Sequence, residues 1–485
     1  MEEAHPGSRA WCAIVGLPPP SGRSVASILL RLVLAVLSLI LAGVKAIATD
    51  ASEATETQVT SGRGGRILTN IGVWSPDSRW LVYDTRSDAA GDDFNGTRIE
   101  AVNVETREVR LVYESRHEAR CGVVTFHPKR WQVVFIHGPE NPTPDWTYGP
   151  FHRQGVCVDW DQPGVAVSLD ARDLSEPMTP GALRGGSHVH VFNGDGTLVS
   201  FTYEDHVLAL ARGAGGADLN QRNIGVSVVG RPVTVKKDHV RNHDGKAFTV
   251  LVSRTENAPR PGSDEIQKAF EEGWVGTNGY VRSDGRRQLA LAFQGLVINS
   301  RGETNSEVYI AELPADLTVP GAGPLEGTAV SRPSPPHGVE QRRLTRTADR
   351  RFAGIQGPRH WLRASPDGSA IAFLMKDDDG VVQLWTVSPL GGPQRQITRN
   401  EHPIASAFTW SPDGRSLAHT MDRSICLTDV AHGTTRRLTA PTSEREAPRP
   451  EACVFSPDGT KVAYLRNLTD TDGLRSNQIF VVSAR

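Results

Sequence analysis

A short phrase, an apolar or aromatic residue followed by Ser-Pro-Asp-Gly and a hydrophobic run, returns at nearly constant intervals along this chain of 485 residues. The three cleanest copies begin at Ser365, Ser411 and Ser456, so the repeat is 45 to 46 residues long. Proline sets φ at the first corner of a turn, aspartate caps the turn, and glycine accepts the positive φ that follows. Each phrase therefore predicts a hairpin between two strands. A fixed repeat of this length is typical of a β-propeller.

Degenerate copies upstream bring the number of predicted turns to seven. They begin at Ser75, His127, Asn193 and Ser283. Similar Arg-x-Leu-Thr or Arg-x-Ile-Thr sequences close the repeats at 342–345, 395–398 and 436–439, which indicates four strands in each blade. We predict an all-β fold, a propeller of seven four-stranded blades. Six or eight blades are the alternatives, because the intervals 193–283 and 283–365 are nearly twice the usual length.

The two ends of the folded region indicate how the ring closes. The last repeat stops at Arg485 after its third strand, and the segment 65–69 has the character of a fourth strand without the first three. We expect 65–69 to pair with 478–482 and close the ring, because an unpaired edge on either side would invite aggregation.

The first 48 residues have the features of a secretory signal peptide. Arg31 precedes a mostly apolar run at 32–44, and Ala46-Ile47-Ala48 follows as a cleavage site. The run is short for a membrane-spanning helix, although an uncleaved anchor is the alternative. We therefore expect a periplasmic or secreted protein without stable membrane insertion after cleavage. A linker at 49–64 would lead into one propeller domain at 65–485.

Charge and cysteine content narrow the possible partners. The net charge is −2, so no global basic field is available to recruit nucleic acid, and we expect none as a partner. We expect a monomer. Four cysteines lie beyond the leader, and they can form two disulfides in an oxidising compartment or stay as free thiols: Cys121, Cys157, Cys426 and Cys453.

Three segments interrupt the repeats, at about 138–155, 257–274 and 314–339. In the second, Ser263 would cap a short helix that extends to Phe270. Long loops on a rigid scaffold often carry function. In a propeller, the loops after second strands lie on the face opposite the Ser-Pro-Asp-Gly turns. On that face we expect the ligand-binding residues His137, Trp146, Tyr148, His152 and Asp205.

Two of these aromatic residues, Trp146 and Tyr148, have two interpretations. They would form a stacking surface for a sugar, or the aromatic loop would pack on itself. Arg241 and His243 lie in a segment dense in hydrogen-bonding groups. The planar guanidinium of Arg241 would suit a carboxylate.

The segment 185–192 contains a His-x-His pair, His188 and His190. Alternate residues of a strand share a face, so the two imidazoles would project together and chelate a divalent cation. His206 would be a third ligand. Imidazole with carboxylate or amide oxygens suits manganese, iron or zinc better than calcium. The alternative is that backbone carbonyls satisfy both histidines.

The Trp/Phe-Ser-Pro-Asp-Gly phrases and their Arg-x-Leu/Ile-Thr closings resemble TolB-type propeller repeats over roughly 65–485. The segments 126–139, 184–192 and 241–250 also resemble an uncharacterised bacterial family of TolB-like propellers. A more distant resemblance, carried by His188 and His190, is to oligogalacturonate lyases. That resemblance implies one divalent metal, manganese above all, held by histidines.

Two functions follow as hypotheses. In one, the propeller is a non-catalytic binding protein that grips a glycan or a protein ligand with its loop-rich face. In the other, it is a metal-dependent lyase that acts on uronate sugars by β-elimination. His243 would then remove the proton and Arg241 would hold the carboxylate.

Overall fold

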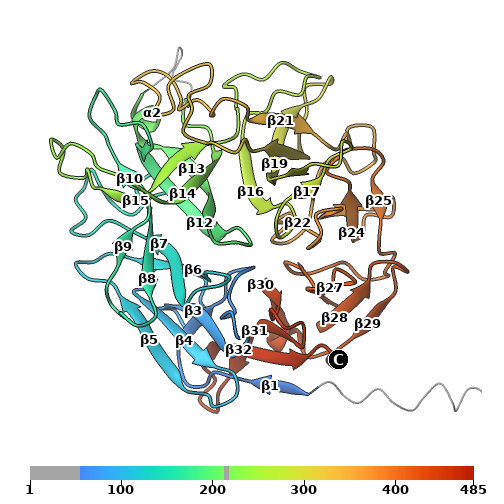
Figure 1. The fold of residues 1–485 in the computed structure, drawn as a ribbon. Helices are drawn as coiled ribbons and strands as arrows, with labels where there is room; N and C mark the ends of the chain where they lie inside the picture. The colour runs from blue at the N-terminus through green and yellow to red at the C-terminus, as the bar shows by residue number, and fades with distance from the viewer. Residues whose placement is uncertain (1–54, 212–217) are drawn as a thin grey trace, which may run out of the picture. The chain divides into compact units, whose positions relative to one another are not determined.

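The computed structural model describes residues 55–211 and 218–485, and these residues form almost only β-strands (Figure 1). The helix α2 (His206–Leu210) and the 3-10 helix η2 (Glu444–Glu446) stand between strands. Within the described residues, no helix combines the length and apolar content needed to cross a bilayer. The signal peptide predicted at 1–48 lies outside the described residues.

Four-stranded sheets make up most of the fold. One sheet contains β6 (Cys121–Phe126), β7 (Gln132–His137), β8 (Gln154–Asp159) and β9 (Val167–Ser168). The next contains β12 (Gly185–Phe192), β13 (Leu198–Asp205), β14 (Asn223–Val233) and β15 (Gly245–Leu251). A third contains β16 (Ala269–Trp274), β19 (Ala290–Ile298), β20 (Thr304–Glu312) and β21 (Glu340–Arg343). Neighbouring strands in each sheet are antiparallel.

Two further four-stranded sheets follow the same plan. They contain β22 (Arg363–Ala364), β23 (Ile371–Lys376), β24 (Val382–Val387) and β25 (Arg395–Gln396), then β26 (Thr409–Trp410), β27 (Ser416–Met421), β28 (Ser424–Asp429) and β29 (Thr435–Arg437). Short two-stranded pairings add β10 (Ala171–Arg172) with β11 (Ala182–Leu183), and β17 (Tyr280–Val281) with β18 (Arg287–Gln288). The sheets follow one another around a common centre, with the first strand of each nearest to it (Figure 1).

The two ends of residues 55–485 meet in one eight-stranded sheet. Its path is β30 (Pro448–Phe455), β31 (Lys461–Thr469), β32 (Arg475–Ser483), β2 (Gly65–Ile67), β3 (Trp80–Arg86), β4 (Arg98–Asn103) and β5 (Val109–Glu114). The remaining strand, β1 (Glu56–Gln58), pairs antiparallel with β32, so that Glu56 faces Val482.

The strand that pairs with β32 is therefore not the predicted one, 65–69. The segment 65–69 begins with β2, which runs antiparallel to β3 and touches β32 only in parallel, through Gly65 and Asn477. Residues 56–58, in the segment predicted as a linker, supply the strand that lies along β32. The prediction that 65–69 is the fourth strand of the last repeat is therefore wrong: the strand covers only Gly65–Ile67 and lies along β3.

The Ser-Pro-Asp-Gly phrases form the predicted turns. In all three clean copies the serine hydroxyl donates to the aspartate carboxylate two residues later, at 2.5, 2.6 and 2.5 Å. The same carboxylate accepts a backbone N–H two residues further on, from Ser369, Arg415 or Thr460. The glycines take φ of 77°, 71° and 70°, which a side chain would oppose. Each phrase therefore joins the inner strand of a sheet to its second strand.

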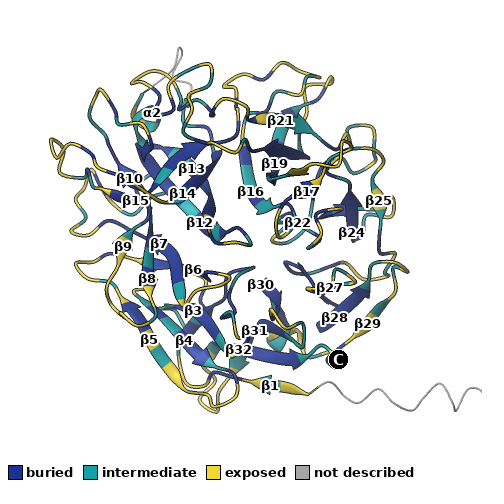
Figure 2. Ribbon diagram, in the orientation of Figure 1, coloured by how far each residue is buried: buried dark blue, intermediate teal, exposed yellow. Residues whose placement is uncertain are grey.

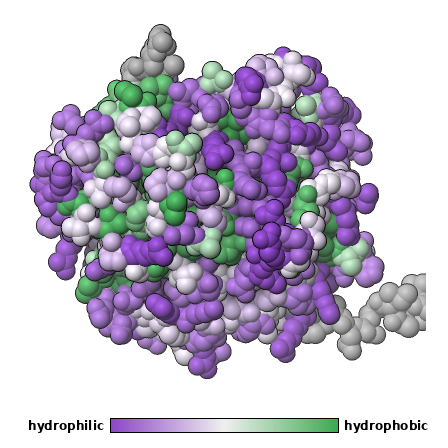
Figure 3. Space-filling model, turned by 45° about the horizontal axis from the view of Figure 1, so that its top comes forward, coloured by the Kyte–Doolittle hydropathy of each residue, from purple (hydrophilic) through white to green (hydrophobic). Residues whose placement is uncertain are grey.

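Side-chain donors tie the inner strands of neighbouring sheets together. The indole of Trp410 donates to the carbonyl oxygen of Arg363 at 2.9 Å, and that of Trp274 donates to Val191 at 2.9 Å. The apolar core lies between adjacent sheets, while turns and outer edges are exposed (Figure 2). On the face shown in Figure 3, apolar residues occur in separate patches among hydrophilic ones.

The structure also shows the conformation of the three segments that interrupt the repeats and the state of the cysteines. No helix forms at 257–274, all of which is described. Ser263 donates to the carbonyl oxygen of Arg260, and the segment ends as the inner strand β16. The segments 138–155 and 314–339 are mostly loop. The four cysteines at 121, 157, 426 and 453 are free thiols.

Candidate functional site

A cavity of about 370 Å³ opens beside the sheet β6–β9, where several predicted site residues meet. We call it the side cleft. Its walls come from β5, β7, β8, β10 and the loop between β14 and β15. The polar residues that line it are Tyr113, His137, Glu140, Gln154, Ser168, Arg172, Arg241, Asn242 and His243, with Trp146 as the aromatic residue from the 138–155 loop. The backbone of Arg172 and that of His243 form an isolated antiparallel bridge, which brings the two chain segments together.

Trp146 supports the cationic wall of the side cleft. The Cζ atom of Arg172 lies 5.4 Å from the indole ring centre, and that of Arg241 lies 5.7 Å from it. Distances of this size allow attraction between each guanidinium and the aromatic ring. The ring also stacks on His152, with centroids 3.8 Å apart, and the residue is only 5% exposed. Because the ring is covered, Trp146 is not the sugar-stacking surface that the sequence suggested.

Arg172 is a buried cation that makes no direct ion pair, although the nearby buried carboxylate of Asp170 raises its pKa from a distance. The side chain is 3% exposed, and no carboxylate of the described residues lies within 4.0 Å of its guanidinium. Its Nη2 donates to the carbonyl oxygens of His152 and Arg153 at 3.2 and 2.6 Å, while its buried Nε has no partner among those residues. Burial lowers the pKa of Arg172 to about 10, which still leaves it charged at neutral pH.

The other side of the side cleft holds two neutral imidazoles. His137 bonds the hydroxyl of Tyr113 through Nε2 at 2.8 Å and the carbonyl oxygen of Gly138 through Nδ1 at 2.7 Å. The Nδ1 atom therefore donates to the carbonyl, and Nε2 accepts from the tyrosine. Burial lowers the pKa of His137, and it lowers that of His243 to about 3. The Nε2 atom of His243 is buried and has no partner among the described residues.

Arg241 is held from below by the 138–155 loop. Its two terminal nitrogens donate to the carbonyl oxygens of Glu140 and Asn141 at 2.9 and 3.0 Å. These bonds orient the guanidinium and leave its charge uncompensated by a carboxylate. Arg241 and His243 thus line the same cavity, and their predicted catalytic roles stay predictions.

The predicted metal ligands do not come together. Around His188, β12 contains a bulge: His188 faces Thr202 and Val191 faces Ser200, so two residues oppose one, and Val189 takes φ of 57°. A bulge reverses the alternation of side chains. His190 therefore lies on the face opposite to His188. The prediction that both imidazoles project together is wrong for this reason.

Each of these histidines has its own surroundings. His188 Nδ1 lies 2.7 Å from a guanidinium nitrogen of Arg153, which puts a positive charge where a cation would have to bind. His190 is fully buried, and neither ring nitrogen has a hydrogen-bond partner among the described residues. A Cβ placed on Gly155 would lie 2.6 Å from His190 Nε2 and 2.8 Å from an oxygen of Asp170, so glycine makes room for both groups.

His206, the third predicted ligand, begins α2 and pairs with His152. Its Nδ1 lies 3.0 Å from His152 Nε2, and burial lowers its pKa to about 4. Among the described residues, no group of three or more His, Cys, Asp or Glu side chains is placed to hold a metal ion. The three histidines therefore do not fit a manganese site.

Two predicted ligand-binding residues have structural roles instead. Asp205 is 1% exposed, accepts from Arg184 at 2.8 Å, and caps α2 by accepting from the backbone N–H of Leu208 at 2.9 Å. Tyr148 stacks on Phe94 with ring centroids 5.0 Å apart and does not line the side cleft. The 138–155 loop thus packs partly on itself, through Trp146 and His152, and partly on Phe94 outside the loop.

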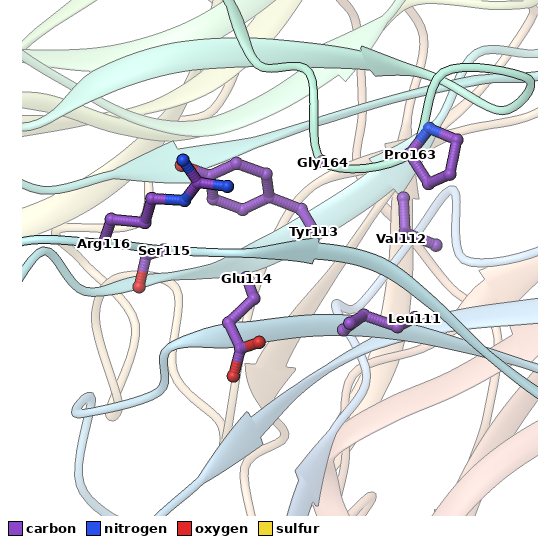
Figure 4. Close-up of a pocket in the computed structure, with 8 residues that line it drawn as sticks. All are labelled: Leu111, Val112, Tyr113, Glu114, Ser115, Arg116, Pro163 and Gly164. Atoms are coloured by element: carbon purple, nitrogen blue, oxygen red, sulfur yellow. The ribbon is translucent and has the colours of Figure 1, made fainter.

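Sequence reasoning missed Tyr113, Gln154 and Arg172, because they belong to strands with no unusual motif. A second hollow of about 440 Å³ adjoins the side cleft along the outer edge of β5 (Figure 4). Tyr113 lines both hollows. There the backbone N–H of Gly164 donates to the carbonyl oxygen of Val112 at 2.8 Å and closes one side.

Comparison with known proteins assigns the chain to a family. A model described as a protein of unknown function, DUF3748, matches residues 120–243, the stretch that contains every predicted site residue. The chain is also 45% identical over 423 residues to the uncharacterized protein YidR of Escherichia coli K12, with 86% of this chain and 97% of YidR covered. The chain belongs to the YidR family. The predicted membership of an uncharacterised bacterial family is thereby confirmed.

Solved structures similar to this member of the YidR family include two oligogalacturonate lyases. One, in complex with manganese, has a TM-score of 0.52 at 12% identity and covers 90% of this chain and 94% of its own. The other, from Vibrio parahaemolyticus, has a TM-score of 0.51 at 10% identity and covers 90% and 95%. At such identities the likeness concerns the fold, and it agrees with the predicted propeller-like, nearly all-β architecture.

Proposed function

We propose that this member of the YidR family is an exported binding protein whose side cleft takes an anionic ligand, with acidic saccharides as the expected class. One observation carries the proposal: a buried guanidinium, Arg172, lines the side cleft with Arg241 beside it, and no carboxylate of the described residues is in direct contact with it, Asp170 acting only from a distance. A buried charge is costly unless it is paired, so a carboxylate on the ligand would supply the missing partner. Arginine also matches carboxylate geometry with two parallel bonds.

The remaining lining suits a ligand with hydroxyl groups. Gln154, Ser168 and Asn242 add amide and hydroxyl groups beside the two arginines. A volume of about 370 Å³ falls in the range of small-molecule pockets. The anionic charge, rather than aromatic stacking, would provide most of the recognition, since Trp146 is covered by its neighbours.

Calorimetric titration with trigalacturonate and with the neutral maltotriose would test the proposal. We expect the acid to bind and the neutral sugar to bind about tenfold more weakly or not at all, since one lost charge-assisted contact is worth roughly 1.5–3 kcal/mol. Arg172→Met and Arg241→Met should each weaken acid binding by a similar factor. The matched control is Arg286→Met, an exposed arginine paired with Asp284.

Two results would contradict the proposal. One is equal affinity for the acidic and neutral sugars, and the other is unchanged acid binding by both arginine variants. If the ligand is a protein instead, neither sugar should bind, and substitutions on the surface outside the side cleft should abolish binding of that protein.

A second candidate is β-elimination on a uronate, and one observation favours it. The unpartnered Nε2 atom of His243 lines the same cleft as the two arginines, so a base and a carboxylate clamp occur together. A pKa of about 3 makes His243 a weak base, which is why binding is the first proposal. The test is ultraviolet absorbance of an unsaturated product from trigalacturonate. Absorbance lost in His243→Gln but kept after dialysis against a chelator would support metal-free elimination.

We further infer seven blades, with the eight-stranded sheet counted as two: β2–β5, and β30–β32 with β1 as the fourth strand. The pairing of β1 with β32 supports closure of the ring by an N-terminal strand. Periplasmic or secreted location follows from the proposed signal peptide at 1–48. N-terminal sequencing of the mature protein and sedimentation would test export and the expected monomer.

A further inference from the structure

A further cavity, of about 340 Å³, opens at the centre of the ring of sheets on the face of the Ser-Pro-Asp-Gly turns. We call it the central mouth. The residues just before the turns line it, together with the prolines of the turns: Trp74, Phe126, Trp410 and Phe455, with Pro76, Pro412 and Pro457. The repeat that builds the fold therefore also builds most of this cavity: four turns each supply an aromatic residue and a proline, Pro128 included, and Phe192 adds a fifth aromatic residue.

The wall of the central mouth is layered. The aromatic side chains are deep, with Trp74 at 4% and Trp410 at 9% exposure, and the prolines at 412 and 457 are exposed at the rim. Flat apolar walls of this kind bury flat apolar groups, at roughly 25 cal/mol per Å² of apolar surface. The walls alone would not distinguish one apolar compound from another.

Arg363 gives the central mouth its chemical preference. It lines the cavity at 5% exposure, and its Nη2 donates to the side-chain oxygen of Asn70 at 2.5 Å. Its Nη1 donates to the carbonyl oxygen of Leu362 at 2.8 Å, while its buried Nε has no partner among the described residues. A guanidinium has five N–H donors, so this one is under-used where it is most desolvated.

Two acidic groups, Glu271 and Glu272, raise the pKa of Arg363 from a distance but make no direct ion pair with it. Glu271 and Glu272 on β16 lie beyond 4.0 Å of its guanidinium. Glu271 accepts from Gln294 at 2.6 Å, and Glu272 accepts from Thr202 at 2.8 Å. Burial raises the pKa of Glu272 to about 7, so that carboxyl group is partly protonated at neutral pH.

We propose that the central mouth is a second binding site, for a compound that carries one carboxylate on a flat apolar body. The carboxylate bonds the free donors of Arg363, and the body lies against the aromatic walls. The same chemistry occurs in small aromatic acids and in the free carboxyl end of an apolar peptide. The site is distinct from the side cleft, whose lining shares no residue with it.

Calorimetry on the purified protein tests this with matched acids and amides. The small-molecule probes are 3-phenylpropionate and 3-phenylpropionamide. The peptide probes are acetyl-Gly-Leu-Phe with a free and with an amidated carboxyl end. We expect at least one acid to bind about tenfold more tightly than its amide. Whichever acid binds identifies the source of the ligand, and both results support the site.

Two sets of variants separate the site from a folding defect. Arg363→Met should abolish the difference between acid and amide, while Arg286→Met, at an exposed arginine outside both cavities, should leave it unchanged. Ile71, half-buried in the lining of the central mouth, provides a charge pair: Ile71→Glu should weaken acid binding several-fold, and Ile71→Lys should not. A damaged fold would weaken both.

The proposal is overturned if neither acid binds more tightly than its amide, or if Arg363→Met keeps the difference. If Arg363→Met does not fold, equal acid affinity in Ile71→Glu and Ile71→Lys overturns it instead.

Discussion

The sheet β26–β29 and the sheets beside the side cleft follow the same antiparallel plan but differ in the hydrogen bonds that their buried histidine side chains make. In β26–β29, the fully buried His419 bonds the hydroxyl of Thr428 through Nε2 at 2.8 Å. In β12, the equally buried His190 bonds nothing among the described residues through either nitrogen. The regular repeat also contains unpartnered buried atoms, at His419 Nδ1 and Thr420 Oγ1, but the region 138–243 holds nine of the nineteen found in the described residues.

This difference teaches where to look for function on a repetitive fold. Buried polar groups usually have partners, so a region with several exceptions needs an explanation. Around the side cleft the exceptions include the side chains of Arg172, His190 and His243. In the central mouth, the buried Nε atom of Arg363 likewise has no partner among the described residues. The following experiments test this contrast between the regular sheets and the region 138–243.

The largest expected effect belongs to Asp205, which the sequence suggested as a ligand-binding residue. Asp205→Ala leaves Arg184 buried without its carboxylate, and removal of one partner from a buried ion pair costs about 3–5 kcal/mol. Urea unfolding should show this loss. Sugar binding by the protein that remains folded should be unchanged. Normal stability with lost binding would instead assign Asp205 to the site.

A pH titration of stability compares wild type with His190→Gln. Burial lowers the pKa of His190 to about 3, below the 6.5 of an unfolded chain, so the unfolded state binds the extra proton between these values. Its contribution is therefore complete above about pH 6.5 and is lost as the pH falls toward 3. We expect the variant to lose stability less steeply than wild type over pH 6 to 4, by up to about 1.4 kcal/mol per pH unit. Equal slopes would contradict the assignment.

Trp410→Phe tests the scaffold side of the contrast. The change removes the indole donor to the carbonyl oxygen of Arg363 but keeps most of the ring. The free energy of unfolding should fall by about 1–2 kcal/mol, as expected for a buried acceptor left unpaired. Trp131→Phe, at a position 39% exposed, is the control and should have little effect.

The smallest effect is expected at Ser263. The hydroxyl caps no helix and lies in an exposed turn, where it donates to Arg260 at 2.7 Å. Ser263→Ala should therefore change the free energy of unfolding by no more than about 0.5 kcal/mol. A loss near 1 kcal/mol, as large as that of a helix N-cap, would contradict this expectation and show that the hydroxyl stabilises the turn more strongly.

Local rules were enough to predict the turns and the sheets that they join. Proline, aspartate and glycine act within four residues of one another, so the turns at Ser365, Ser411 and Ser456 follow from sequence alone. The propeller-like architecture followed from their spacing. His137, Trp146, Arg241 and His243 line one cavity in the structure, and their role in binding stays a prediction.

Long-range geometry decided the rest. A single bulge in β12 turned His190 away from His188, and no rule of alternation along the sequence reveals a bulge. Arg172 became a site residue because an isolated bridge brings it to His243, far along the chain. The sequence alone thus determined which strands and turns form, since those depend on neighbours along the chain. Only the tertiary structure decided which side chains face a common cavity, since that depends on register and on packing between sheets.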